Sequence, residues 1–235
     1  MPKNKKELSH IAIIMDGNRR FAKRLMRHPS KGHEWGAKKI GDLINWCKEL
    51  DIRQVTLYSL SVENFNRPKD EFDYLMDLFR KEFDKLKEDK RLYENKIRVR
   101  APGRTWMLPD DVQEKVREIT QRTKDHDAYT INFALAYGGR QEIVDTVKTL
   151  IDKVETGEIS KDDIDENLFL RNLQMPDEPD IIIRTGGERR TSNFFPYQTT
   201  YAELFFLDKM WPEFSKEDLQ EIIDIYHGRE RRFGR

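Results

Sequence analysis

The feature that most constrains this chain is a short apolar run near its start, residues 11–15, which stops abruptly at Asp16, Gly17 and Asn18. An unbroken apolar run of this length, closed by turn-forming residues, is typical of a strand buried on both faces of a parallel sheet. Such a strand emerges at the carboxyl edge of the sheet, where open α/β folds bind ligands. Taken alone, the segment is equally consistent with a tight turn followed by solvated arginines.

Strand patterns and helix patterns alternate along the rest of the chain, which indicates an α/β fold. We predict a single domain, residues 1–235, built on a mostly parallel six-stranded sheet flanked by helices, with residues 1–9 as a flexible N-terminal arm. Residues 21–30 are predicted to be irregular. The remaining predicted elements are strands at residues 54–60, 96–100, 129–137, 180–184 and 204–207, and helices at 35–50, 68–86, 109–124 and 139–153, a short one capped by Ser160, and a last one capped by Ser215.

The charge balance and the cysteine content narrow the class of protein. Lys plus Arg and Asp plus Glu number 43 each in 235 residues, so no global field attracts nucleic acid and any electropositive site must be local. The one cysteine, Cys47, excludes an internal disulfide framework and fits a reducing compartment. Neither a signal peptide nor an apolar run long enough to span a membrane is visible. We expect a cytoplasmic protein with no nucleic-acid partner.

Five predicted strand exits contain arginine; four of them also contain glycine, and the other, residues 61–67, contains two asparagines. In a parallel sheet these exits lie along one edge, where glycines free backbone N–H groups and guanidinium groups bind phosphate with paired hydrogen bonds. Together they predict a ligand with more than one phosphate, and Asp16 and Glu203 are available to hold Mg²⁺. No nucleotide-binding glycine motif is present. The exits are residues 16–20, 61–67, 102–104, 138–140 and 184–190.

Several longer motifs occur in order from residue 10 to residue 234. They are Asp-Gly-Asn-Arg-Arg-Phe-Ala-Lys from residue 16, Gly-His-Glu-x-Gly from 32, Ser-Val-Glu-Asn-Phe-Asn-Arg-Pro from 61, Tyr-Gly-Gly-Arg from 137, Ile-Arg-Thr-Gly-Gly-Glu from 183, Ser-Asn-Phe from 192, Tyr-Ala-Glu-Leu-Phe-Phe from 201, Trp-Pro from 211 and Arg-Glu-Arg-Arg-Phe-Gly from 229. This set resembles the motifs of the cis-prenyltransferases, the undecaprenyl diphosphate synthase family.

The resemblance implies a Mg²⁺-dependent prenyltransferase that condenses isopentenyl diphosphate with an allylic prenyl diphosphate and forms cis double bonds. A growing hydrocarbon needs a dry apolar wall, so the bulky stripe on the predicted helix 68–86 is expected to line a tunnel in part, although such stripes ordinarily pack into a core. Peripheral membrane contact would help a long product to leave, yet no amphipathic anchor is visible. The stripe consists of Phe72, Leu75, Met76, Phe79, Phe83 and Leu86.

The resemblance also implies roles for individual residues. Asp16 is expected to hold Mg²⁺ and assist departure of the allylic diphosphate, Glu203 to be a second ligand, and Asn64 to help remove the proton. In the family, the partner subunit's tail, here Arg232 to Gly234, reaches the site, so a homodimer is implied. The expected substrate-binding residues are Gly17, Asn18, Arg19, Arg20, Phe21, His33, Ser61, Val62, Glu63, Phe65, Arg67, Arg184, Arg190, Thr191 and Ser192.

The chain departs from the pattern of bacterial family members at three positions. Pro29 falls where an arginine contacts the diphosphate, and either Arg27 or Lys31 is expected to replace it. Arg189 stands where a histidine often lies near the metal, and Ala136 replaces an asparagine. These departures bear on the choice of allylic substrate and acceptor, not on the reaction class.

Other interpretations compete with a synthase. A non-catalytic subunit of a related enzyme, a synthase with an unusual prenyl acceptor and a general phosphate-binding protein are the alternatives. The first is expected to lose the catalytic aspartate and the arginine clamp, and the last does not need an apolar stripe.

The acidic pair at residues 110–111 imitates the metal motif of trans-prenyltransferases, but acids after Pro109 suit the positive end of a helix better. His28 and His33 lack a second cluster of zinc ligands.

Overall fold

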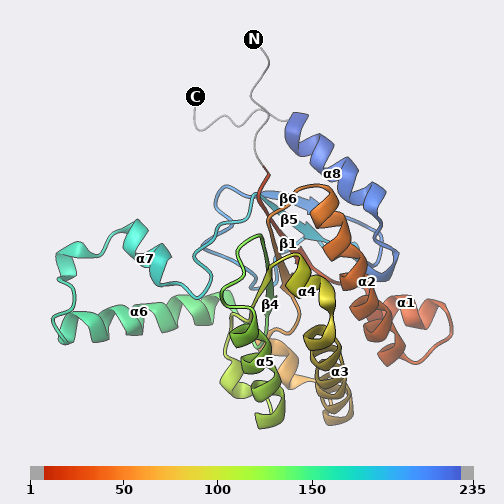
Figure 1. Ribbon diagram of the computed structural model, residues 1–235, viewed down its shortest axis with the longest axis horizontal. Coiled ribbons are helices and arrows are strands. Elements are labelled where there is room, and N and C mark those ends of the chain that lie inside the picture. Colours follow the sequence, from red (N-terminus) through yellow and green to blue (C-terminus); the bar gives the residue numbers. More distant parts are fainter. Residues whose placement is uncertain (1–7, 229–235) are drawn as a thin grey trace.

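The structure, a computed structural model that describes residues 8–228, is built on a six-stranded sheet in which each neighbouring pair of strands is parallel (Figure 1). This confirms the predicted α/β fold. The strand order is β3-β4-β2-β1-β5-β6, so the first strand of the chain lies inside the sheet. The strands are β1 (His10–Ile14), β2 (Gln54–Tyr58), β3 (Ile97–Arg100), β4 (Tyr129–Ala134), β5 (Ile181–Arg184) and β6 (Glu203–Phe206).

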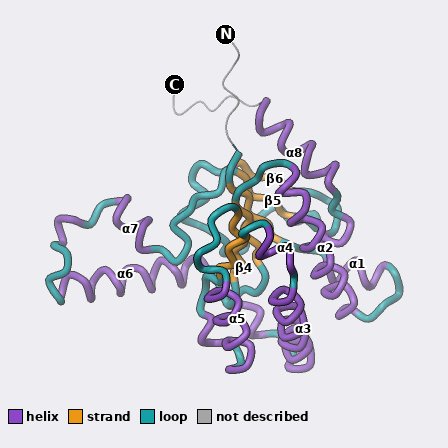
Figure 2. Tube along the Cα trace, in the orientation of Figure 1, coloured by secondary structure: helices purple, strands orange, loops and turns teal. Residues whose placement is uncertain are grey.

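The two faces of the sheet are covered differently (Figure 2). On one face, Ile11 and Ile13 join a large apolar core with helices α2, α3, α5 and α8. On the other face, Ala12 packs with Phe194 and Phe195 from the irregular segment between β5 and β6. Helices α6 and α7 project away from the sheet. The helices are α1 (Asn18–Arg24), α2 (Pro29–Glu49), α3 (Lys69–Glu88), α4 (Lys90–Glu94), α5 (Asp110–Arg122), α6 (Gly139–Glu155), α7 (Glu166–Asn172) and α8 (Lys216–Gly228). Within residues 8–228, no helix is long and apolar enough to cross a membrane.

The segment after β1 differs from the prediction. Residues 18–24 form α1, although residues 21–30 were predicted to be irregular, and α2 begins at Pro29 instead of residue 35. Gly17 has a φ of 99°, in the left-handed region that glycine tolerates, and this lets the chain turn from β1 directly into α1. Because the segment is basic and has little apolar periodicity, the sequence pattern does not reveal this helix.

Buried hydrogen-bonded side chains connect three neighbouring strands, β1, β2 and β4. His10 Nε2 lies 2.8 Å from Thr56 Oγ1, and Asn132 Nδ2 donates to the same hydroxyl at 2.8 Å. Burial is the main cause that lowers the pKa of His10 to about 4, although the negative charge of Asp177 acts in the opposite direction. His10 is therefore neutral in the folded protein at pH 7.

The buried, neutral His10 predicts that the protein loses stability in mild acid. In the unfolded protein His10 takes up a proton as the pH falls below its ordinary pKa of 6.5, whereas the folded protein resists protonation down to about pH 4. Protonation thus favours unfolding across this window, and His10 contributes a loss of about 3 kcal/mol between pH 7 and pH 4. Urea unfolding at a series of pH values measures the loss. A His10→Gln variant should show a flatter pH dependence than the parent, and equal slopes would contradict the assignment.

Candidate active site

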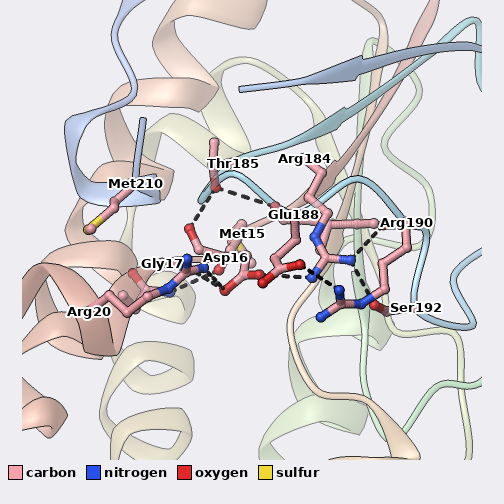
Figure 3. Close-up of polar contacts among 12 residues, drawn as sticks. Met15, Asp16, Gly17, Arg20, Arg184, Thr185, Glu188, Arg190, Ser192 and Met210 are labelled. Atoms are coloured by element: carbon pink, nitrogen blue, oxygen red, sulfur yellow. Dashed lines mark hydrogen bonds and ion pairs between the residues drawn. The ribbon is translucent and has the colours of Figure 1, made fainter. Parts of the chain in front are cut away.

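The site is organised around Asp16, two residues beyond the carboxyl end of β1 (Figure 3). The N–H of Gly17 donates to Asp16 Oδ1 at 2.6 Å, Arg184 Nη2 donates to Oδ2 at 2.8 Å, and Arg20 Nη2 lies 3.2 Å from Oδ1. Burial acts to raise the pKa of Asp16, but the hydrogen bonds from Arg184 and Gly17 and the guanidinium charges outweigh it, so the pKa lies below its usual value. The carboxylate is ionised at neutral pH.

Arg184, the last residue of β5, lies beside Asp16 because β1 and β5 are paired in register. Its side chain is 5% exposed. Nη1 donates to Ser192 Oγ at 2.7 Å and to the carbonyl oxygen of Arg190 at 2.5 Å, while Nε has no partner within the described residues. A guanidinium group with a free N–H at the wall of a cavity is a ready donor to an anion.

The turn after β2 supplies a second group of polar side chains. The N–H of Ser61 donates to Asn64 Oδ1 at 3.1 Å, which orients the Asn64 amide. The guanidinium groups of Arg19 and Arg67 both contact the carboxylate of Glu71, and Arg19 Nη1 lies 3.3 Å from its Oε1. This carboxylate therefore fixes two cations from different segments at the same edge of the sheet.

His33 lies on α2 at the wall of the cavity that Asp16 and Arg184 also line. Its Nε2 is buried without a hydrogen-bond partner in the described part of the chain. Burial, followed by the positive charge of Arg67, lowers the pKa of His33 to about 4. The ring is neutral at pH 7, so it can donate or accept one hydrogen bond to a ligand but does not add positive charge.

One cavity of about 1040 Å³ joins this polar end to an apolar interior between α2 and α3. Asp16, Arg67 and Arg184 lie at the polar end. The stripe prediction is confirmed in part, because Leu75, Phe79, Phe83 and Leu86 line the cavity whereas Phe72 packs on Phe65 with ring centroids 5.0 Å apart. The opposite wall, which the sequence pattern did not indicate, is formed by α2 residues Ala37, Ile40, Gly41 and Ile44.

The structure brings most of the predicted site residues to this edge of the sheet. Phe21 instead packs edge-on against Trp35, and Thr191 lines a smaller neighbouring pocket. Neither Arg27 nor Lys31 lines the main cavity, so which of them replaces the arginine that is lost at Pro29 stays a prediction. The predicted residues that do line it are Asp16, Asn18, His33, Ser61, Glu63, Asn64, Arg67, Arg184, Arg190 and Ser192.

The prediction that Glu203 shares a metal ion with Asp16 is wrong for a single copy of this chain. Glu203 begins β6 and pairs with Ile181, the first residue of β5, which in turn pairs with Ile11. Glu203 therefore lies at the amino edge of the sheet, opposite the edge at which Asp16 emerges. The predicted partner contacts of Arg232 and Gly234 lie outside the described residues.

Asn193 is a site residue that the sequence analysis did not assign to the site, although it lies in one of the quoted motifs. Its side chain joins three exits of the sheet: Nδ2 donates to Glu63 Oε1 at 2.9 Å and to Gln141 Oε1 at 3.0 Å, and the N–H of Arg140 donates to Asn193 Oδ1 at 2.9 Å. The residue lies in the Ser-Asn-Phe motif. Its role as a tether depends on packing between segments that are more than 50 residues apart.

The packing of α1 on α2 gives a prediction about the fold. A Cβ at Gly32 would lie 1.9 Å from the carbonyl oxygen of Asn18, which is backbone and cannot move aside. Gly32→Ala is expected to push α1 away from α2 and to destabilise the protein by on the order of 3 kcal/mol. Thermal unfolding measures this effect. Gly41→Ala in the same helix is the matched control, because a Cβ there meets only Arg91 Nη2 at 3.8 Å, and it should not lower the melting temperature.

Comparisons with known proteins agree with this geometry. The sequence profile of undecaprenyl diphosphate synthase matches residues 14–234. The chain belongs to the undecaprenyl diphosphate synthase family of cis-prenyltransferases. It is 48% identical over 228 residues to tritrans,polycis-undecaprenyl-diphosphate synthase (geranylgeranyl-diphosphate specific) of Thermococcus kodakarensis, covering 96% of this chain and 86% of the relative. The Pyrococcus horikoshii protein of the same name is 49% identical with the same coverage.

A solved structure agrees at the level of the fold and the family. The crystal structure of lavandulyl diphosphate synthase from Lavandula x intermedia, in complex with dimethylallyl diphosphate, superposes with a TM-score of 0.92 and 33% identity, covering 97% of this chain and 98% of that one. This cis-prenyltransferase therefore elongates prenyl chains, and the cavity that begins at Asp16 is its candidate active site.

Proposed function

We propose that this prenyltransferase extends geranylgeranyl diphosphate, a C20 allylic starter, with successive molecules of isopentenyl diphosphate to give a long polyprenyl diphosphate. The observation that carries the proposal is a single cavity with an arginine-lined polar end and an apolar interior. The polar end suits two diphosphate groups, and the interior suits a growing hydrocarbon. The choice of a C20 starter is supported by the names of the two archaeal relatives at 48% and 49% identity.

Each addition breaks the C1–O bond of the allylic diphosphate, forms a bond from that C1 to C4 of isopentenyl diphosphate, and releases a proton from C2 of the latter. Negative charge develops on the departing diphosphate, so positive groups fixed beside it lower the barrier; one well-placed donor is worth ~3 kcal/mol. We assign this role to Arg20 and Arg67 with the N–H groups at the start of α1. The clamp of Arg184, Arg190 and Ser192 is assigned to isopentenyl diphosphate.

The residues at the polar end fit a magnesium ion that is shared with a substrate. Mg²⁺ is commonly held by one or two carboxylates together with substrate phosphates, and Asp16 offers one ionised carboxylate at the cavity wall. When bound, the ion supplies charge stabilisation at the leaving diphosphate. Arg184 and Gly17 hold the Asp16 carboxylate in place for it.

A homodimer forms part of the proposal. Helix α6 projects from the body (Figure 1) and leaves an apolar stripe about half exposed, at Val144, Val147 and Ile151. Their spacing of three and four residues places them on one face of the helix. A second copy of this chain would cover this face by an isologous contact. Val147→Asp with Ile151→Asp is expected to give a monomer by light scattering, and an unchanged mass would place the contact elsewhere.

Incorporation of radiolabelled isopentenyl diphosphate tests the reaction. The purified chain is incubated with Mg²⁺ and, separately, with C10, C15 and C20 allylic diphosphates, and chain lengths are read after removal of the phosphates. We expect the highest rate with the C20 starter and no product when the metal is chelated. A preference for C15 would overturn the proposed starter. Absence of incorporation with every starter, from folded protein, would overturn the proposed reaction.

A further inference from the structure

The turn that follows α1 has an unusual apolar residue at its tightest point. The N–H of Arg27 donates to the carbonyl oxygen of Ala22 at 2.9 Å and that of Met26 to Lys23 at 3.0 Å, the hydrogen-bond pattern that commonly ends a helix with a glycine. Here the left-handed position is held by Met26, with a φ of 52°. A methionine at this position is less favourable than glycine, because its Cβ crowds the backbone.

No contact within the described part of the chain accounts for a methionine at this position, because Met26 is 96% exposed and its neighbour Leu25 is 48% exposed. We call residues 23–27 the α1 tip. The end of α1 lies at the periphery of the molecule (Figure 1), and the two adjacent apolar residues there are exposed. An apolar side chain that disfavours its own backbone conformation and packs on none of the described residues points to an external partner.

The charges around the α1 tip indicate which partner. Residues 17–33 contain six lysines and arginines and no acidic residue, in a chain whose overall charges balance. Among the described residues, Lys23 and Arg27 make no ion pair, whereas Arg24 is paired with Glu213 at 2.5 Å. The exposed pair of Leu25 and Met26 is thus bordered by free positive charge on both sides. Cations around a small apolar tip complement a surface that has anionic headgroups above a hydrocarbon layer.

We propose that the α1 tip docks this enzyme on anionic membranes, with Leu25 and Met26 inserted at the boundary between headgroups and acyl chains. The need for such a partner rests on the proposed function, since a long polyprenyl diphosphate leaves its enzyme most readily into lipid. Helix α2 follows the tip directly and forms one wall of the cavity, so a docked tip holds the tunnel beside the bilayer. A protein partner would more often require a larger apolar patch.

Binding to vesicles without substrate tests docking independently of the reaction. The full chain is sedimented with phosphatidylcholine vesicles that lack or contain about a third phosphatidylglycerol. We expect binding only to the anionic vesicles and a weakening as the salt concentration rises. Lys23→Ser with Arg27→Ser is expected to lower the partition coefficient by about 30-fold. Failure of the parent chain to bind anionic vesicles would overturn the proposal, whatever the outcome of the prenyl-transfer assay.

Met26→Gly separates docking from folding. Glycine suits the left-handed position, so we expect the melting temperature to rise by about 2 °C while vesicle binding falls by about tenfold. Trp106→Ser with Met107→Ser, which removes another exposed apolar pair after β3, is the matched control and should bind as the parent does. Rates measured in detergent should be the same for all of these variants. A Met26→Gly variant that binds vesicles normally, or that changes the oligomeric state instead, would overturn the assignment to lipid.

A fluorescent label on the α1 tip reports insertion of the tip itself. Binding of anionic vesicles through the basic ends of the chain would not produce this signal. Cys47 is buried, and burial raises the pKa of its thiol to about 12, so it reacts slowly and an engineered cysteine is labelled selectively. An environment-sensitive dye on Met26→Cys should shift to the blue with anionic vesicles. The same dye on Trp106→Cys should not shift. Equal responses from the two positions would overturn insertion through the α1 tip.

Discussion

Replacing Asp16 with asparagine is expected to lower kcat for isopentenyl transfer by about 10³-fold, because the carboxylate anchors both the proposed metal ion and the buried guanidinium of Arg184. The change keeps the shape of the side chain and a hydrogen-bond acceptor for the N–H of Gly17. It removes the negative charge on which the arrangement of Arg20 and Arg184 depends. Initial rates at saturating substrate measure the effect, and circular dichroism verifies the fold.

The control for this variant is Asp111→Asn. Asp111 also accepts a two-fold contact from an arginine, Arg80, but on the outer surface between α3 and α5 and away from the cavity. Loss of that pair should leave kcat unchanged, since exposed ion pairs contribute little. If Asp16→Asn retained more than about a tenth of the parent rate, Asp16 would not stabilise the departing diphosphate to the extent argued.

The lowered pKa values of Asp16 and His33 limit the causes of any pH dependence of the rate. Since the pKa of its carboxyl lies below the usual value, Asp16 is ionised between pH 6 and pH 7 in the free chain. His33 is likewise neutral at any pH well above 4. A fall in kcat/KM between pH 7 and pH 6, which reports the free enzyme and free substrates, would therefore come from the last ionisation of the diphosphates or from unfolding, and not from either residue.

The edge at which the site lies could be predicted from the sequence, because the relevant signals are local. The apolar run of β1 and the Asp16–Gly17 turn are adjacent in the chain, and a parallel sheet places the ends of all its strands together. The position of Glu203 within one copy of the chain could not be predicted for a related reason. Its motif indicated a metal ligand, but the register of β6 on β5, which the motif does not reveal, places Glu203 at the amino edge of the sheet.

The second wall of the cavity could not be predicted for a different reason. Helical periodicity shows that α2 has an apolar face, but not whether that face meets solid core or empty space. Gly36 and Gly41 lie on the same helix and look alike in sequence. In the structure a Cβ at Gly36 would lie 2.4 Å from Asn18 Oδ1, whereas one at Gly41 meets only the tip of Arg91. Close packing at one glycine and open space at the other become visible only with the three-dimensional structure.

The open space at Gly41 gives a prediction about product length. Arg91 spans the far end of the cavity: its Nη1 donates to Asn45 Oδ1 on α2 at 3.1 Å, and its Nη2 donates to Asp89 Oδ2 at 2.6 Å. Gly41 lines the cavity just inside this bridge. Gly41→Leu would place four carbon atoms there, roughly the volume of one five-carbon unit in a close-packed interior. We expect products at least one isoprene unit shorter.

The fold should tolerate this change, because leucine in place of glycine favours a helix interior by about 1 kcal/mol. Arg91→Ala removes the bridge between α2 and the start of α4 and is expected to act in the opposite sense, giving longer chains from the same starter. Chromatography of the dephosphorylated products measures both. Since the two substitutions flank one end of the cavity and should shift chain length in opposite directions, identical product distributions from both variants would mean that the hydrocarbon does not grow between α2 and α3.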